Sequence, residues 1–272
     1  MRFGLCTGNL EVLRQLASWG YDYAEIGGST VVPFEDDRAF APIRTELLEI
    51  GVPIEALAGF VPGSVPVIGP TVDQAQILGY LETTIGRAAD VGVKVVNWGS
   101  VVSRRVPDGW PMSKAWDQIE RVAALIADIA AKSGVTIAVE AVNPREANIL
   151  FYLTEALNLV RTVDRTNLRL NVDYYHLVKQ NEPPEHLTAA APFLAHAHTS
   201  DDNRGFPGLG AWDQKPFLQS LKAGGYDGRL SFEVRGTFNP QFAEDAQRSV
   251  RLMRRLQAEV EGETNPTPRP SP

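Results

Sequence analysis

Polar residues end four consecutive apolar segments in the second half of the 272-residue chain. These residues are Glu140 after VTIAV, Asp173 after LRLNV, His198 within LAHAHTS and Glu233 after RLSF. Carboxylates and imidazoles ligate divalent cations and move protons. A single residue of this kind more often caps a helix, pairs with an arginine or lies hydrogen-bonded in the core. Four of them around one axis would be costly to bury without a counter-ion, so the set predicts a cation site.

The predicted site holds one divalent metal ion. Three carboxylates and one imidazole form an oxygen-rich ligand set, which favours Mn²⁺ or Mg²⁺ and also suits Co²⁺ or Zn²⁺. We take Mn²⁺ as the first choice. Cys6 is the only cysteine, so the chain has no intrachain disulfide and no thiolate cluster, and we expect Cys6 to be a small buried residue of the first strand.

Eight apolar or β-branched segments must position these residues. They alternate with amphipathic stretches of about 10 to 20 residues, which is the pattern of a parallel sheet covered by helices. The expected strands cover residues 2–6, 23–27, 53–59, 93–99, 135–142, 168–174, 194–200 and 229–235. This count predicts an α/β fold, a (β/α)8 TIM barrel in a single domain, whose chemistry lies at the carboxyl ends of the strands. A doubly wound open sheet is the alternative, although the turn CTGN lacks its glycine-rich phosphate motif.

The barrel domain is expected over residues 1–258. The final segment, 259–272, is polar and rich in proline, so we expect a disordered tail. Residues 60–73, FVPGSVPVIGPTVD, contain too much Pro and Gly for a helix, and we expect a loop over the barrel mouth.

Composition excludes two classes of partner. With 33 acidic and 26 basic residues the net charge is -7, and the basic residues are scattered, so no nucleic-acid interface is expected. No apolar run approaches the roughly 20 residues needed to cross a bilayer. The N-terminus MRFGLCTGNL also lacks the apolar core of a signal peptide, so we expect a cytoplasmic protein without a membrane partner.

The segments around the four residues resemble those of the xylose isomerase-like TIM barrels, in particular the D-tagatose 3-epimerase and hydroxypyruvate isomerase types. The matching segments are EAVNPRE (140–146), DYYH (173–176), HAHTSDDNR (196–204) and FEVRG (232–236). The resemblance implies that the metal ligands are Glu140, Asp173, His198 and Glu233. It also implies substrate contacts from Glu146, His176 and Arg204. His198 favours the epimerase type, because hydroxypyruvate isomerases typically carry glutamine there.

The chemistry implied by this resemblance is proton transfer next to a carbonyl through a metal-bound enediolate. Glu140 and Glu233 are expected to be the catalytic groups, one removing the proton and the other returning it. The predicted activity, in carbohydrate metabolism, is that of a ketose 3-epimerase. A hydroxypyruvate-type aldose–ketose isomerase and a metal-dependent dehydratase of the inosose or 3-dehydroshikimate type remain alternatives. The expected substrate is a small unphosphorylated sugar or keto acid, and the resemblance implies a homodimer or homotetramer.

Three further polar or aromatic residues lie near predicted strand ends. Trp98 would form an aromatic wall against the substrate, with core packing as an equal alternative. His196 precedes His198 by two residues, so it should point the same way one layer deeper and be buried there without ligating. Glu25 is left open between a role in the site and a structural one.

Two other functions of this fold are disfavoured by composition. A nuclease of the endonuclease IV type needs many more histidine ligands than the four histidines of this chain, and its DNA partner does not suit an acidic protein. A non-catalytic sugar-binding barrel is disfavoured because the set of four polar residues is intact.

Overall fold

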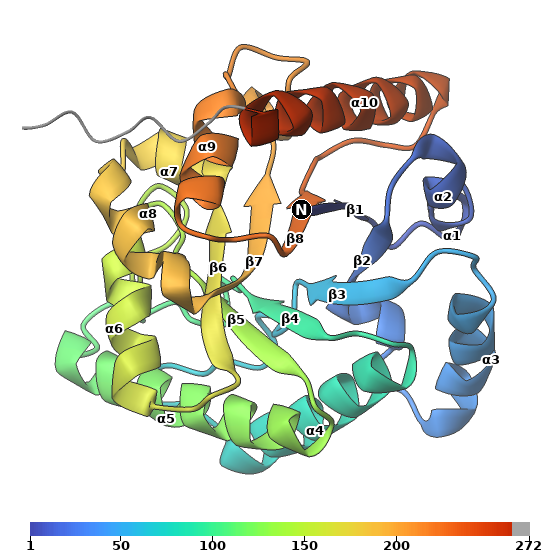
Figure 1. Cartoon of the computed structure of the whole chain (residues 1–272). Coiled ribbons are helices and arrows are strands. Elements are labelled where there is room, and N and C mark those ends of the chain that lie inside the picture. The colour runs from blue at the N-terminus through green and yellow to red at the C-terminus, as the bar shows by residue number, and fades with distance from the viewer. Residues whose placement is uncertain (263–272) are drawn as a thin grey trace, which may run out of the picture.

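Eight parallel strands pair in sequence order and close into a barrel in the computed structural model, which describes residues 1–262 (Figure 1). The strands are β1 (Arg2–Cys6), β2 (Tyr23–Gly27), β3 (Ile54–Ala58), β4 (Val95–Trp98), β5 (Thr136–Glu140), β6 (Leu168–Asp173), β7 (Leu194–Thr199) and β8 (Arg229–Phe232). β8 pairs with β1, so the sheet closes on itself. The prediction of a single-domain (β/α)8 barrel is confirmed, and the open-sheet alternative is wrong.

Helices surround the barrel on its outer side (Figure 1). The longer helices are α3 (Asp37–Leu48), α4 (Gln74–Asp90), α5 (Met112–Lys132), α6 (Leu153–Val163), α9 (Lys215–Ala223) and α10 (Pro240–Gly262). The shorter ones are α1 (Leu10–Leu13), α2 (Leu16–Trp19), α7 (Tyr174–Gln180) and α8 (Pro184–Ala190), with 3₁₀ turns η1 (Gly28–Val31), η2 (Ala191–Phe193) and η3 (Asp202–Arg204). In α5 the buried residues Ile119, Val122 and Ile126 recur at helical spacing, which gives the helix one apolar side for the barrel.

Side chains at helix starts account for several of the acidic and amide residues. Asn9, Asp36 and Asp73 each accept hydrogen bonds from the first backbone N–H groups of α1, α3 and α4. Asp173 caps α7 in the same way while it ends β6, through a 2.9 Å bond from the Tyr175 amide to Oδ1. The capping role and a role in the predicted site are therefore compatible, because the cap uses Oδ1 and leaves Oδ2 to the cluster.

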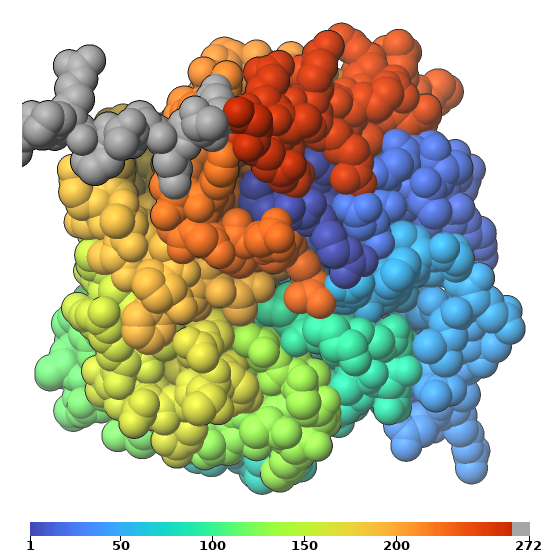
Figure 2. Space-filling view, viewed as in Figure 1, coloured from blue at the N-terminus to red at the C-terminus, as the bar shows by residue number. Residues whose placement is uncertain are grey.

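The helix α10 closes the ring of helices against the first units of the barrel. It contacts α9 and α2, and Arg254 donates to the Gly20 carbonyl at 2.8 Å and to Asp22 at 2.7 Å. In the space-filling view the red surface of α10 adjoins the blue N-terminal region (Figure 2). This packing joins the last helix to the first strand–helix unit.

The predicted end of the domain at residue 258 falls inside α10, which continues to Gly262. The rest of the predicted tail, 263–272, lies outside the described residues. Residues 60–73 form turns and bends without a helix or strand, as the sequence predicts. None of the described helices combines the length and apolar character needed to cross a lipid bilayer.

Inside the barrel, a tyrosine fills the layer below the polar strand ends. Tyr23 is fully buried and packs in a small inner cluster with Ala56, Val95 and Ala138. Its hydroxyl group lies 2.7 Å from Ser231 Oγ. Tyr23 pairs in register with Gly4, where a Cβ would overlap the tyrosine ring. The absence of a side chain at Gly4 is therefore what admits the ring.

Gly4→Ala should lower the free energy of unfolding by about 1–3 kcal/mol, because the added methyl group overlaps a fully buried ring, which must shift. Urea denaturation followed by circular dichroism measures the change. Gly79→Ala in α4 is the matched control, since no described atom lies within 4 Å of the added methyl position. It should stabilise the helix by about 0.5–1 kcal/mol. Similar changes in both variants would contradict the packing role of Gly4.

Candidate metal centre

Four polar side chains meet at the carboxyl end of the barrel. They belong to Glu140, Asp173, His198 and Glu233, and one ligand-type atom from each lies within 4.8 Å of the others. Glu140 and Asp173 end β5 and β6, His198 is the penultimate residue of β7, and Glu233 follows β8. These four strands are consecutive neighbours in the sheet. The structure therefore brings the sequence-predicted set together in one cluster.

His198 is at the centre of this cluster. Its Nδ1 lies 3.6 Å from Glu140 Oε1 and 3.7 Å from Glu233 Oε2, and this buried nitrogen has no hydrogen-bond partner among the described residues. Its Nε2 donates to Glu25 Oε1 at 3.0 Å. Metal-ligating histidines usually have this arrangement, with one ring nitrogen bonded to a carboxylate and the other directed at the ion. The unpartnered Nδ1 among carboxylates fits a cation.

Glu25 is the site residue whose role the sequence analysis left open. It is fully buried and accepts hydrogen bonds from His196 Nε2 at 2.7 Å and from His198 Nε2 at 3.0 Å. Burial raises the pKa of Glu25, but His198 and His196 outweigh burial and hold it well below its usual value. His196 is buried below His198, as predicted, and contacts Ser231 Oγ at 3.4 Å. The one sequence signal was a carboxylate inside an otherwise uncharged strand, YAEIG.

The Glu140 carboxylate is held by amides from both neighbouring strands. Asn97 Nδ2 donates to Oε2 at 2.9 Å, and Asn171 Nδ2 donates to Oε1 at 3.1 Å. A Cβ at Gly99 would overlap Oε2, so a glycine is needed there. Burial raises the pKa of Glu140, but the neighbouring His198 outweighs burial and lowers it. Glu140 is therefore an oriented, ionised carboxylate.

Arg204 provides positive charge to the cluster. Its Nη1 donates to Asp173 Oδ2 at 2.6 Å and lies 2.7 Å from Glu233 Oε2, and its guanidinium lies 3.9 Å from the centre of the Tyr175 ring. Asn203 and Arg204 both have positive φ, at 54° and 59°, a conformation that is strained for residues other than glycine. The strained turn directs the guanidinium between two of the predicted ligands.

The two carboxylates bound by Arg204 differ in acidity. Burial raises the pKa of Asp173, but Arg204 outweighs burial and lowers it to about 2. For Glu233, burial raises the pKa to about 7, although Arg204 and His198 oppose the rise. The negative charges of Glu140 and Asp173 act in the same direction as burial on Glu233. Glu233 is therefore poised to exchange a proton near neutral pH, whereas Asp173 stays ionised.

A cavity of about 200 Å³ opens above the cluster. Its lining includes Glu140 and Glu233 together with the predicted substrate contacts Glu146, His176 and Arg204. His176 lies between two of its neighbours, with Nδ1 2.8 Å from Asn143 Nδ2 and Nε2 3.1 Å from Arg204 Nη2. Glu146 accepts from Asn143 Nδ2 at 3.1 Å. The structure thus places all three predicted contacts at one cavity.

Trp98 is not placed at this cavity. Its side chain is fully buried and lies outside the set of described residues that line the cavity, and Arg104 lies 5.6 Å above its ring. Neighbouring side chains of a strand point to opposite faces, and Asn97 points into the barrel at Glu140. Trp98 therefore points away from the barrel interior and packs in the hydrophobic core. The structure does not place it as an aromatic wall against the substrate, and the core-packing alternative holds.

The fold and the cluster define a (β/α)8 barrel with a carboxylate–histidine centre at the carboxyl ends of its strands. Residues 13–256 match the family described as xylose isomerase-like TIM barrel. The chain belongs to this family.

Named relatives of the chain include two epimerases. A ketose 3-epimerase of Arthrobacter globiformis is 30% identical over 138 residues, which are 50% of this chain and 47% of that protein. A D-psicose 3-epimerase of Agrobacterium fabrum is 23% identical over 226 residues, covering 81% of this chain and 77% of the relative. The chain thus spans about half the length of the first relative and three quarters of the second.

A solved structure of D-psicose 3-epimerase in the presence of D-fructose has the same fold. It superimposes with a TM-score of 0.83 at 18% identity, covering 94% of this chain and 99% of the other.

Arg204→Met should destabilise the metal-free protein by about 3–5 kcal/mol, because it leaves Asp173 and Glu233 without their cation. Urea unfolding in EDTA measures the loss. Saturating Mn²⁺ should stabilise this variant more than the wild type, because the ion then replaces the missing charge in the native state.

Arg235→Met is the matched control for this experiment. Arg235 lines the same cavity but is exposed, and it makes no ion pair with any residue of the 1–262 region. Its removal should change stability by less than about 0.5 kcal/mol. Equal losses in both variants, or a Mn²⁺ response no larger than that of the wild type, would contradict the charge balance described above.

Proposed function

We propose that the chain is a divalent-cation-dependent isomerase, and specifically a ketose 3-epimerase. The observation that carries the proposal is the position of Glu140 and Glu233, whose carboxylates lie 3.6 and 3.7 Å from the same nitrogen of His198 and line the same cavity. Glu140 ends β5 and Glu233 follows β8, so β6 and β7 separate them and they approach the cavity from different sides. The epimerase names of the relatives support this choice of activity.

The cluster fits a divalent cation by its donor set and by the unpartnered Nδ1 of His198. The residues that would hold the ion are Glu140, Asp173, His198 and Glu233. Mn²⁺ is our first choice, because three carboxylates and one imidazole suit a hard cation that accepts nitrogen. When bound, such an ion supplies Lewis-acid polarisation of a substrate carbonyl, which acidifies the neighbouring C–H bond.

The protein's own groups then move the proton. Glu233, which lines the cavity beside the cluster, is placed to remove the proton from C3 on one face of the substrate. The C3–H bond breaks, its electron pair moves toward the C2 carbonyl oxygen, and the carbon becomes planar. Glu140, oriented by Asn97 and Asn171, takes up a proton from solvent and delivers it to the opposite face as the carbonyl re-forms. Glu233 then releases the proton it removed to solvent. No atom is gained or lost, and the configuration at C3 is inverted.

The remaining cavity residues orient the substrate in this proposal. Arg204 and His176 would bind hydroxyl oxygens of the ketose, and Glu146 would accept from a hydroxyl group at the cavity wall. Glu25 does not reach the cavity lining; its hydrogen bond to His198 Nε2 keeps Nδ1 directed at the cluster. Glu25 and His196 are therefore positioning residues.

Glu233→Gln should reduce kcat by about 10²–10⁴-fold while metal content stays near that of the wild type, because an amide oxygen can still ligate but the amide cannot accept the proton. Stopped assays of epimer formation and elemental analysis measure the two quantities. Glu244→Gln on α10 is the matched control, since Glu244 is exposed and outside the cavity. Undiminished turnover in Glu233→Gln would exclude Glu233 as a proton-transfer group.

The activity itself is tested by incubating the Mn²⁺-loaded protein in D₂O with D-fructose, D-tagatose and hydroxypyruvate, and following deuterium by NMR. Incorporation at C3 of a ketose together with its epimer is the expected result. Label at C1 or C2 with an aldehyde product would replace the proposal with an aldose–ketose isomerase. Absence of exchange with metal bound would contradict proton transfer on these substrates.

A further inference from the structure

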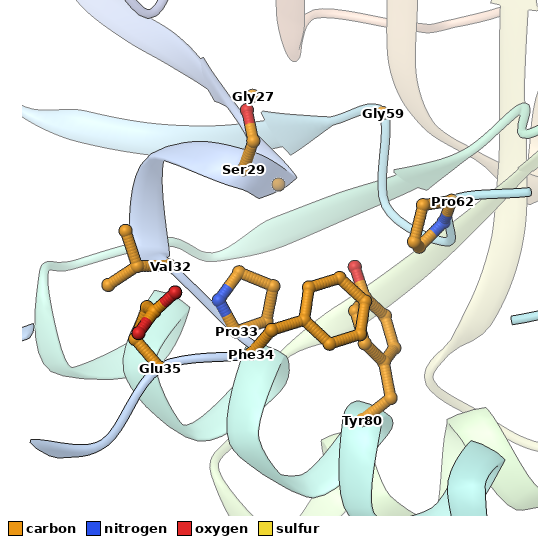
Figure 3. Close-up of a pocket in the computed structure, with 10 residues that line it drawn as sticks. Gly27, Ser29, Val32, Pro33, Phe34, Glu35, Gly59, Pro62 and Tyr80 are labelled. Atoms are coloured by element: carbon orange, nitrogen blue, oxygen red, sulfur yellow. The ribbon is translucent and has the colours of Figure 1, made fainter. Parts of the chain in front are cut away.

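A second cavity, of about 280 Å³, lies between the loops that follow β2 and β3 (Figure 3). Its lining is mainly apolar, and Phe34 and Tyr80 form one wall with their ring centres 5.3 Å apart. Figure 3 shows Pro62 beside these rings and Ser29 across the space from them. The other lining residues are Gly27, Gly28, Val32, Pro33, Glu35 and Gly59.

The wall of this cavity is held in a fixed conformation. Arg87 is buried, and its guanidinium donates to the carbonyl groups of Val32 at 2.6 Å and Glu35 at 2.9 Å. It also donates to the Asp37 carboxylate at 2.9 Å. Val32 has φ of 41°, a left-handed conformation that is unfavourable for a β-branched residue by about 1–3 kcal/mol. Strain that is maintained by a buried arginine indicates a preformed site.

The two loops also approach each other closely. A Cβ at Gly28 would lie 2.7 Å from the Gly59 carbonyl oxygen, so only glycine permits this approach. The Tyr80 hydroxyl donates to the Phe60 carbonyl, which fixes the ring against the second loop. Phe34, by contrast, is 62% exposed, so a ligand in the cavity would cover apolar surface that is now in water.

The second cavity and the candidate metal centre both lie at the carboxyl end of the barrel. Gly27 follows Glu25 by two residues on β2, so both face the barrel interior in successive layers roughly 6–7 Å apart. Glu25 is bonded to His198. On the neighbouring loop, the Val61 amide donates to Ser100 Oγ at 3.0 Å, next to Gly99 in the lining of the metal-centre cavity.

We propose that the second cavity binds an apolar, ring-sized substituent on the end of the substrate remote from the reacting carbon. The proposal rests on the proposed function, because the metal-centre cavity is taken to hold the reacting carbons. The chemistry of the lining sets the ligand class. Among the described residues that line the cavity, Glu35 alone has a charged side chain, and its carboxylate repels a terminal phosphate or carboxylate. The substrate class is therefore a neutral ketose derivative with an alkyl or aryl group.

The test compares D-fructose with 6-O-benzyl-D-fructose on the Mn²⁺-loaded protein. Calorimetric titration gives the two dissociation constants, and NMR in D₂O gives exchange at C3 in parallel. The wild type should bind the benzyl ether at least roughly tenfold more tightly than D-fructose. Phe34→Ala should weaken binding of the benzyl ether roughly tenfold and leave D-fructose within about twofold, because only the ether contacts the aromatic wall.

Leu48→Ala is the matched control, because Leu48 is also an exposed apolar residue, at the opposite end of the helix that follows the same loop. It should change neither constant. Equal binding of the two ligands by the wild type, or equal effects of Phe34→Ala on both, would overturn the proposal. Binding of the ether that depends on Phe34, without exchange at C3, would leave the cavity assignment standing and contradict the epimerase activity alone.

Discussion

The burial of several carboxylates at one end of the barrel is the constraint on which the rest of the site depends. Glu25, Glu140 and Asp173 are buried and Glu233 is partly so, and each of these charges needs a donor or a cation. His198 and His196 donate hydrogen bonds to Glu25, while asparagine amides donate hydrogen bonds to Glu140. Arg204 serves Asp173 and Glu233 from a strained turn. None of residues 1–262 donates to or accepts from His198 Nδ1 in the middle of this arrangement, where one divalent ion would complete it.

The barrel and the cluster at its mouth could be predicted from the sequence for a physical reason. Parallel strands that close in order place their carboxyl ends on one rim, so residues at the ends of four apolar segments must be neighbours. The sequence did not determine which way a side chain points where every residue of a strand is buried. The strand VVNW is buried at every position, so alternation does not show that Asn97 faces inward and Trp98 outward. The Glu25–His198 bond joins residues 173 positions apart, and only closure of the barrel brings them together.

The rim of the barrel is divided between two kinds of surface. β5 to β8 carry the charged cluster, whereas the loops after β2 and β3 carry the apolar cavity with Phe34 and Tyr80. In this account, the charged half performs proton transfer and the apolar half recognises the remote end of the substrate. Because different loops carry the two surfaces, substrate preference can change in the family without altering the charge balance that stabilises the centre.

The most direct test of the central claim is anomalous diffraction at the manganese edge from crystals grown with MnCl₂. We expect one strong peak bounded by Glu140, Asp173, Glu233 and Nδ1 of His198, with the Arg204 guanidinium withdrawn from Asp173 and Glu233. A cluster without a peak, with Arg204 still paired to both carboxylates, would contradict this expectation. In that case the arginine, and not a metal ion, would be the permanent counter-charge of this site.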